Sequence, residues 1–193
     1  MNTRDSILNF AYNEIHNNGF QGLRADKALP VLKISKGALY HHFPNKQVLG
    51  YSVVEEIVAK NYISRWEHIL KFEGHPIEFF IQSFERMRQY ETADSLRKGC
   101  ILNNLIQEMS PLDEGFRSRL KHIIDKIHHH QTNGIRFGLE KGLIRRDVNI
   151  DAEAHFIQSG IEGAYSLGKV HQNRVVFQSC MNSLIKYVNS LRA

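Results

Sequence analysis

Helical spacing of apolar residues runs through almost the whole chain, and few residues interrupt it. The 193 residues include only four prolines. Near the start, Ile7, Leu8, Ala11 and Ile15 recur at the three-and-four spacing of one helix face. No run of alternating apolar and polar residues indicates a strand. The sequence therefore predicts an all-α protein with about nine helices.

Capping residues and helix breakers divide this pattern. Thr3, Ser35 and Asn45 are suitable N-caps, and Gly19 follows the first helix where a residue with positive φ is favoured. The expected helices cover residues 3–17, 25–31, 35–43, 45–71, 77–92, 99–109, 113–141, 151–170 and 174–191.

Positive charge is concentrated in the first quarter of the chain. The formal net charge is +5. Residues 1–46 hold six basic and three acidic residues. The other 147 residues hold nineteen basic and seventeen acidic residues. A basic segment of this kind suits a polyanionic partner such as nucleic acid. A merely solvated surface would have the same composition, so charge alone leaves both readings open.

Several functional classes are disfavoured. Two cysteines, Cys100 and Cys180, make no disulfide framework, and we expect a cytoplasmic protein. No apolar run is long enough for a membrane span, so no membrane partner is expected. No nucleophile elbow, phosphate loop or Glu-x-x-His spacing occurs, and we expect neither an enzyme nor a cofactor. The consecutive histidines 128–130 diverge by roughly 100° per residue on a helix, which disfavours a metal site.

The stretch SKGALYHHFPNK, residues 35–46, predicts a short helix with one polar face. Lys36 and Tyr40 fall on that face, Leu39 falls on the opposite side, and Gly37 permits close approach to a bulky surface. A rod roughly 10 Å long fits a DNA major groove about 12 Å wide. A connecting helix with a solvated face is the alternative. The candidate DNA contacts are Lys36, Gly37, Ala38, Tyr40, His41 and Lys46.

The same stretch resembles the recognition helix of the TetR family of transcriptional regulators. The match comprises residues 36–43 and Lys46, with Gly19 and Phe20 at the family's usual distance upstream. The resemblance covers residues 4–50 closely. It implies a three-helix helix-turn-helix DNA-binding domain at residues 1–50, and a helical bundle for ligand binding and dimerisation at 51–193. It also implies a ligand-responsive repressor that binds a palindromic double-stranded DNA operator as a homodimer.

Three positions depart from the family pattern. Arg24 stands where a capping Ser or Thr is usual, Pro30 falls inside the second helix, and Lys33 replaces a frequent turn glycine. A weakened support helix is therefore expected. These departures leave an alternative open, namely an all-helical small-molecule-binding protein with a weakened DNA-binding head.

Aromatic and sulfur-containing side chains are dense between residues 51 and 100, where the resemblance places a pocket for a small apolar or electrophilic effector. Core packing is the alternative for any single residue. Gly99 and Cys100 resemble a subgroup motif whose cysteine responds to electrophiles or oxidants in some members. Arg97, Lys98 or a helix N-terminus would make Cys100 reactive by lowering its pKa, whereas a buried small hydrophobe is the alternative. The candidate pocket residues are Tyr62, Trp66, Phe80, Phe84, Met87, Cys100 and Asn104.

Small residues recur every four positions at Gly160, Ala164 and Gly168, which makes one helix stripe nearly flat. The resemblance implies that this helix and the last one form a four-helix interface with a second copy. Packing within one chain is the alternative. The candidate interface residues are Phe156, Gly160, Ala164, Gly168, Met181 and Leu184.

Overall fold

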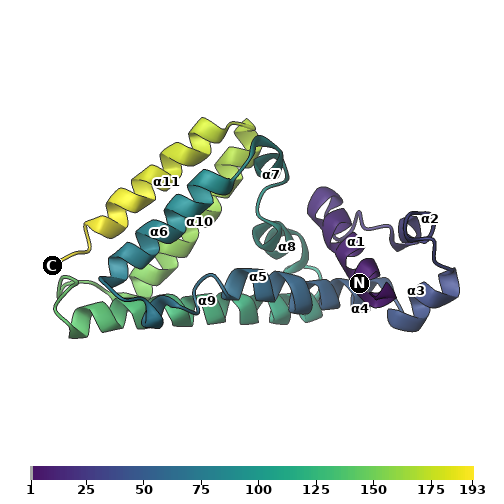
Figure 1. The fold of residues 1–193 in the computed structure, drawn as a ribbon, viewed down its shortest axis with the longest axis horizontal. Coiled ribbons are helices and arrows are strands. Elements are labelled where there is room, and N and C mark those ends of the chain that lie inside the picture. The colour runs from purple at the N-terminus through teal and green to yellow at the C-terminus, as the bar shows by residue number, and fades with distance from the viewer. Residues whose placement is uncertain (1) are drawn as a thin grey trace. The chain divides into compact units, whose positions relative to one another are not determined.

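The computed structural model describes residues 2–193, which form helices joined by short turns (Figure 1). No β-strand occurs in this range, where Ile144 and Arg192 form an isolated antiparallel bridge. The all-α prediction is therefore confirmed. The α-helices are α1 (Thr3–Asn18), α2 (Ala28–Leu32), α3 (Lys36–His42), α4 (Lys46–Ser52), α5 (Ala59–Ile63), α6 (Pro76–Tyr90), α7 (Ala93–Lys98), α8 (Ile101–Met109), α9 (Glu114–Glu140), α10 (Ile150–His171) and α11 (Arg174–Asn189).

The chain packs into two compact units. The first contains Met1–Asn61 and Ile101–Ile123, and the second contains Tyr62–Cys100 and Ile124–Ala193. Helix α9 contributes residues to both units. The predicted domains, 1–50 for DNA binding and 51–193 for ligand binding and dimerisation, are defined by function. These two packing units do not test them, so they stay a prediction. Across residues 2–193, no helix has both the length and the apolar character needed to cross a membrane.

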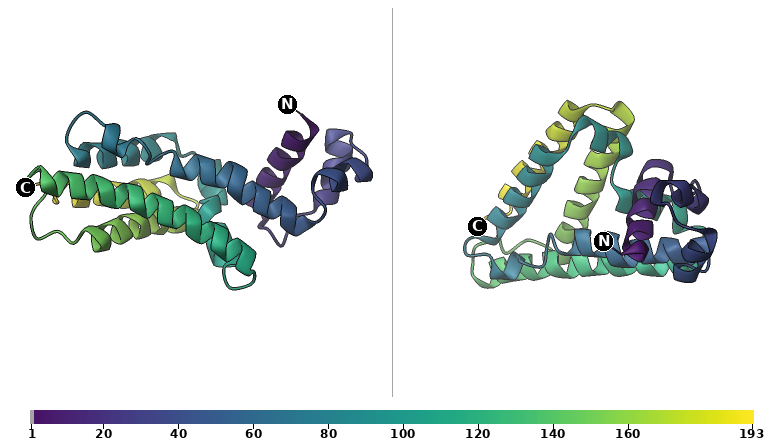
Figure 2. Two further views of the ribbon diagram at one scale, coloured as in Figure 1. Left: turned by 90° about the horizontal axis from the view of Figure 1, so that it is seen from below. Right: turned by 45° about the vertical axis from the view of Figure 1, so that its right-hand side comes forward.

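In the first unit, helices α1, α2 and α3 gather into a small group that Figures 1 and 2 show from three directions. The buried stripe of α1 consists of the four residues at helical spacing, Ile7, Leu8, Ala11 and Ile15. Helix α3 adds Leu39 and Phe43, each 2% exposed. The ring centroids of Phe20 and Phe116 lie 4.4 Å apart, which joins the turn after α1 to the start of α9.

Helix α4 continues without a break through the π-helical segment η2 (Val53–Val58) into α5. Val53, Val54 and Val58 are buried on its inner side. The segment carries adjacent carboxylates: Glu55 binds Arg119 of α9, and Glu56 binds Arg4 of α1. π-helical turns are rare and often mark functional segments.

Local capping follows the sequence closely at most helix ends. Ser35 caps α3 and Asn45 caps α4, as predicted, and Gly19 ends α1 with φ of 75°. The first helix is capped by Asn2 instead of Thr3, because the Asn2 side chain accepts the N–H of Asp5 at 2.8 Å.

The region between residues 63 and 100 differs most from expectation. The predicted helix 45–71 ends at Ile63, and the 3₁₀ turn η3 (Ile69–Lys71) follows. The short helix α7 was not predicted. It begins with a capping box between Thr92 and Ser95, and it ends at Gly99 with φ of 76°. A six-residue helix is too short for a periodic apolar pattern to reveal it.

In the second unit, α6, α10 and α11 run side by side (Figures 1 and 2). Phe80 and Phe84 of α6 and Phe177 of α11 are fully buried. Trp66 is 2% exposed, and its ring centroid lies 5.7 Å from that of Phe80 and 6.4 Å from that of Phe84. These aromatic residues form the centre of the unit's core.

Candidate nucleic-acid interface and ligand cleft

Helix α3 presents its polar face outward. The Ser35 hydroxyl accepts the N–H of Ala38 at 3.1 Å and starts the helix. Leu39 is buried beneath it, whereas Tyr40 is 46% exposed. The Lys36 ammonium lies 5.9 Å from the centroid of the Tyr40 ring, so these two candidate contacts share one surface. Helix α3 therefore has an exposed polar face and a buried anchoring face, and DNA binding by the exposed face stays a prediction.

Gly37 occupies open space on that surface. A Cβ added there would meet only the Ser35 Oγ atom, at 3.8 Å. Packing within the chain therefore does not require glycine at this position. A requirement for glycine would have to come from a partner that approaches the helix closely.

The support segment before α3 is short but formed. Arg24 makes no side-chain cap, as its chemistry predicted, and the 3₁₀ turn η1 (Ala25–Lys27) precedes α2. Pro30 lies in the first turn of α2, where backbone N–H groups lack helical partners and a missing N–H costs little. Lys33 ends α2 in the left-handed conformation, with φ of 54°. The sequence predicts a weakened support helix because of Pro30, but the strained backbone in this segment is at Lys33.

Lys46 has partners within the chain. Its ammonium donates to the carbonyl of Gln21 at 2.8 Å and lies 5.0 Å from the centroid of the Phe20 ring. A phosphate contact from Lys46 stays a prediction, and it would share the ammonium's three donors with Gln21.

Arg4 makes long-range contacts that the sequence pattern did not reveal. It forms a bidentate ion pair with Glu56, with N···O distances of 2.7 and 2.6 Å, and its guanidinium carbon lies 5.1 Å from the centroid of the Phe43 ring. The pair lowers the pKa of the Glu56 carboxyl. Fifty-two residues separate the two partners, so no local spacing predicts the contact.

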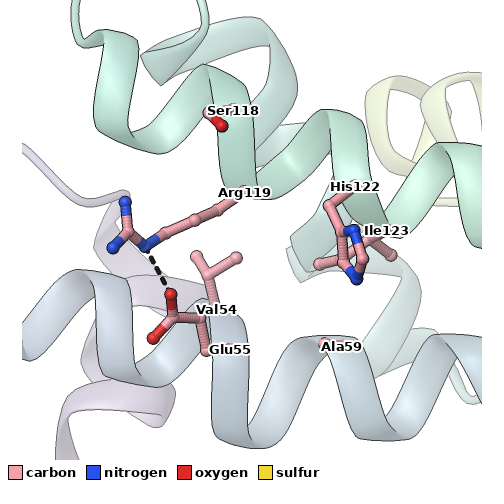
Figure 3. A pocket seen from close by; sticks show the side chains of 7 residues that line it. All are labelled: Val54, Glu55, Ala59, Ser118, Arg119, His122 and Ile123. Atoms are coloured by element: carbon pink, nitrogen blue, oxygen red, sulfur yellow. Dashed lines mark hydrogen bonds and ion pairs between the residues drawn. The ribbon is translucent and has the colours of Figure 1, made fainter.

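A groove of about 510 Å³ lies between the η2–α5 segment and the first turns of α9, all within the first unit (Figure 3). Glu55 and Arg119 form an ion pair of 2.7 Å across one end. His122 stands at the other end, and Val54 and Ile123 supply apolar lining. Glu55 and Arg119 bind each other, so a charged ligand would have to compete with this ion pair.

The second unit brings four of the predicted pocket residues together: Tyr62, Trp66, Met87 and Cys100 line one small space. Its volume is about 10 Å³, at the lower limit for one water molecule. Phe80 and Phe84 pack behind Trp66 and do not line the space. Asn104 belongs to the first unit. We call the residues around this space the inner cluster; it includes Tyr62, Trp66, Met87 and Cys100. Phe80 and Phe84 support it by packing against Trp66.

Glu162 is the main polar group of this inner cluster, and sequence reasoning did not identify it. Its Oε1 atom accepts a hydrogen bond from the Gln158 amide at 2.9 Å, and the Cys100 sulfur lies 3.9 Å away. Within residues 2–193 its Oε2 atom is buried with no hydrogen-bond partner. Burial raises the pKa of the Glu162 carboxyl to about 7. Glu162 is therefore largely uncharged below neutral pH.

Cys100 is 4% exposed, and its sulfur lies 3.3 Å from the Tyr62 hydroxyl. The two cations considered as activators both bind Asp94, Arg97 at 2.8 Å and Lys98 at 2.9 Å. These contacts lower the pKa of Asp94 to about 2. The proposed activation of the Cys100 thiol by Arg97 or Lys98 thus competes with established ion pairs.

An open cleft of about 250 Å³ adjoins the inner cluster and shares Arg65, Met87 and Tyr165 with it. Helix α6 faces the cleft with Ser83, Met87 and Arg86, spaced as neighbours on one helix side. The remaining lining residues are Tyr90 and Glu91. The sequence does not single out Arg65 and Arg86, because isolated arginines are mostly found on exposed surfaces.

The small-residue stripe of α10 packs largely against α11 of the same chain. A Cβ at Gly160 would lie 3.0 Å from Leu184, and one at Gly168 would lie 3.1 Å from Phe177. Met181 is fully buried within the chain, and Leu184 is 5% exposed. These contacts correspond to the intrachain alternative, and the assignment to an interface stays a prediction.

The outer face of α10 and α11 nevertheless exposes apolar side chains. Phe156 is 52% exposed, Leu167 45%, Val170 73% and Val175 69%. A groove of about 400 Å³ lies on this face, lined by Phe156, Gly160, Gly163, Ala164, Leu167, Ser179, Cys180, Ser183, Leu184 and Tyr187.

The three consecutive histidines do not converge. The His128 ring stacks on that of His155, with centroids 4.3 Å apart, and its Nε2 atom lies 3.6 Å from Asp151. Among residues 2–193 no group of three or more His, Cys, Asp or Glu side chains has the arrangement of a metal site.

Comparison with known proteins gives consistent matches. Residues 80–184 match the family described as Tetracyclin repressor-like, C-terminal domain. The HTH-type transcriptional repressor DhaR of Mycobacterium sp. (strain GP1) is 27% identical over 173 residues, covering 86% of this chain and 85% of DhaR. The transcriptional regulator AcuR of Cereibacter sphaeroides is 26% identical over 167 residues, covering 86% and 75%.

Solved structures show the same fold. A TetR transcriptional regulator from Chloroflexus aurantiacus superposes with a TM-score of 0.86 at 22% identity, covering 98% of this chain and 96% of that one. Reduced NemR of Escherichia coli superposes with a TM-score of 0.85 at 20% identity, covering 99% and 97%.

Proposed function

The chain belongs to the tetracycline-repressor-like (TetR) family of transcriptional regulators, and we propose that it represses transcription by binding a palindromic operator as a homodimer. An effector that binds in the second unit would release the DNA. The protein is then a cytoplasmic regulator that binds its effector without transforming it.

The outward polar face of α3 carries this proposal. Lys36 and Tyr40 share an exposed surface, while Leu39 and Phe43 anchor the helix from behind. A helix anchored in this way can enter a major groove as a rigid element. Lys36 reaches a guanine edge or a phosphate, Ala38 a thymine methyl group, and Tyr40 and His41 phosphate oxygens.

Dimerisation is supported by the exposed apolar face of α10 and α11. Phe156, Leu167, Val170 and Val175 would be removed from water by a second copy of the same face. A two-fold axis through this contact presents the same patch from both partners. Two reading heads about 34–36 Å apart would then match successive major grooves of a palindrome.

Release of DNA requires an effector that prefers one separation of the two reading heads over another. The inner cluster around Tyr62 and Cys100 and the adjoining cleft at Arg65 support a binding site for such an effector. Because the space in the inner cluster is only about 10 Å³, the cluster must open, or the effector must bind mainly in the cleft.

A fluorescence-anisotropy titration against the DNA upstream of the chain's own gene tests the proposal. We expect sequence-specific binding that weakens steeply with salt, because lysine contacts to phosphate release counterions. The double variant Lys36→Ala, Tyr40→Ala should abolish specific binding. Lys71→Ala removes one exposed lysine from the second unit and should leave binding unchanged. Equal binding to unrelated DNA, or an intact double variant, would reject the operator function and favour a small-molecule-binding protein without a DNA target.

A further inference from the structure

We propose that the effector is a small organic monocarboxylate whose anionic group binds Arg65 and Arg86 at the cleft of the second unit. The existence of an effector rests on the proposed function, and the new step is its chemical class. A carboxylate fits the planar fork of an arginine guanidinium through two parallel hydrogen bonds.

Both arginines are exposed and available at the cleft. Arg86 projects from α6, and Arg65 follows α5. Across residues 2–193 neither guanidinium forms an ion pair or hydrogen bond with a protein group. Arg65 instead lies over the Tyr62 ring, 4.5 Å from its centroid, which leaves its N–H donors unused. Most other arginines of the second unit have polar partners, such as Asn182 for Arg88.

The charge balance of the cleft favours a single negative charge. Among the lining residues that the structure describes, Glu91 is the only acid. Its two oxygens accept hydrogen bonds from Tyr165 at 2.6 Å and from Ser95 at 2.5 Å, so both oxygens already have partners. Below neutral pH, where Glu162 beside Arg65 is largely protonated, two guanidinium groups and one carboxylate leave a net charge of one positive unit.

The remainder of the ligand would be apolar and small. Met87 and Tyr165 line both the cleft and the inner cluster, and they provide thioether and ring surfaces behind the arginines. The cleft volume of about 250 Å³ is slightly below the range of ordinary ligand pockets, which indicates a compact molecule.

A cationic effector is the competing interpretation, because Glu162 has an unpartnered oxygen in the inner cluster. Two observations disfavour it. The space beside Glu162 holds about 10 Å³, too little for an alkylammonium group. Arg65 also lines that space, and its positive charge opposes a second cation.

The intrinsic fluorescence of Trp66 provides a direct test. It is the chain's single tryptophan, and it lines the inner cluster together with Arg65, Met87 and Tyr165. The probes are butanoate, hexanoate and octanoate, each compared with its primary amide and its primary amine. We expect at least one acid to change the fluorescence and to bind about tenfold more tightly than its amide.

Substitutions of the two arginines test whether the preference for an acid over its amide arises at the cleft. Arg65→Gln and Arg86→Gln should each lower the affinity for the acid about tenfold and leave the affinity for the amide unchanged. Arg88→Gln removes the same charge from the same helix outside the cleft, and it should have no effect. Calorimetry repeats each titration independently of any change in Trp66 emission caused by substitution.

Three results would overturn the proposal: equal binding of acid and amide, tighter binding of the amine, or no response to any of the acids at millimolar concentration. An equal loss in Arg88→Gln would also overturn it, since bulk charge would then explain the preference. Operator binding is measured separately, without probes. Specific DNA binding without acid binding rejects the effector class alone, and acid binding without DNA binding rejects the regulatory function alone.

Discussion

The Glu108 carboxylate of α8 accepts a hydrogen bond from the backbone N–H of Phe20 at 2.8 Å. Its other oxygen accepts the N–H of Gln21, also at 2.8 Å. A Cβ at Gly19 would lie 2.8 Å from the same carboxylate, so glycine is needed there for close approach as well as for its φ of 75°. The Lys46 ammonium donates a hydrogen bond to the Gln21 carbonyl. An acid from α8 and a base from α4 thus hold the turn after α1.

Glu108→Ala should destabilise the protein by about 1–3 kcal/mol, because two backbone N–H groups lose their acceptor. Urea unfolding followed by circular dichroism measures this change. Glu108→Gln keeps one acceptor oxygen at the same distance, so its loss of stability should be clearly smaller than that of Glu108→Ala. Equal stability of Glu108→Ala and the parent would mean that water replaces the carboxylate without cost.

Lys33→Gly should stabilise the protein by about 1 kcal/mol, because Lys33 holds a left-handed φ of 54° that only glycine adopts without strain. Lys33→Ala removes the same charge but keeps the Cβ atom, so it should give no such gain. Comparing the two variants by chemical denaturation separates backbone strain from charge. Similar denaturation midpoints for the two variants would show that the backbone at Lys33 is not strained.

How much of this molecule was predictable from sequence depends on the range of the interactions involved. The α1 stripe, the caps at Ser35 and Asn45, and the face of α3 follow from residues within one or two helical turns. The Arg4–Glu56 and Glu108–Phe20 contacts join residues 52 and 88 positions apart, and they depend on how helices pack. Glu162 was missed for the same reason: a lone glutamate on α10 has no local signal that it will be buried beside Cys100 and Tyr62.

The stability of the protein should fall between pH 5 and pH 8 through Glu162. Burial raises the pKa of this carboxyl to about 7, above its value near 4.5 in the unfolded chain. The folded state therefore holds the proton more tightly, and the resulting stability is present at low pH and lost as pH rises through 7.

Glu162→Gln removes this dependence. Its stability relative to the parent should increase by about 2 kcal/mol from pH 5 to pH 8, measured by urea unfolding at both values. Asp113→Asn is the matched control. The N–H of Phe116 lowers the pKa of Asp113, so this carboxyl is ionised in both states over the range and its effect should not change with pH. A parallel pH profile for Glu162→Gln and the parent would contradict the raised pKa.

Leu167→Glu should weaken a dimer formed through α10 and α11 by at least about a hundredfold, since a buried charge would face the partner. Leu167 is 45% exposed in the single chain, so the substitution leaves the folded protomer intact. Sedimentation velocity over a concentration series measures the dissociation constant. Leu112→Glu, which alters a 63% exposed leucine of the first unit, should leave the dissociation constant of the dimer unchanged. Unaltered association of Leu167→Glu would place the interface elsewhere.

Gly37→Ala should separate stability from DNA binding. The added methyl group meets only Ser35, at 3.8 Å, and alanine favours the helix by about 0.5 kcal/mol, so the protein should become slightly more stable. Operator affinity should nevertheless fall about tenfold, because a Cβ atom on the reading face keeps the helix from the groove. The salt dependence should stay the same, whereas Lys36→Ala should lower the salt slope by about one, as expected for a lost phosphate contact. Anisotropy titrations at several salt concentrations distinguish the two variants, and undiminished operator binding by Gly37→Ala would show that α3 does not approach DNA along this face.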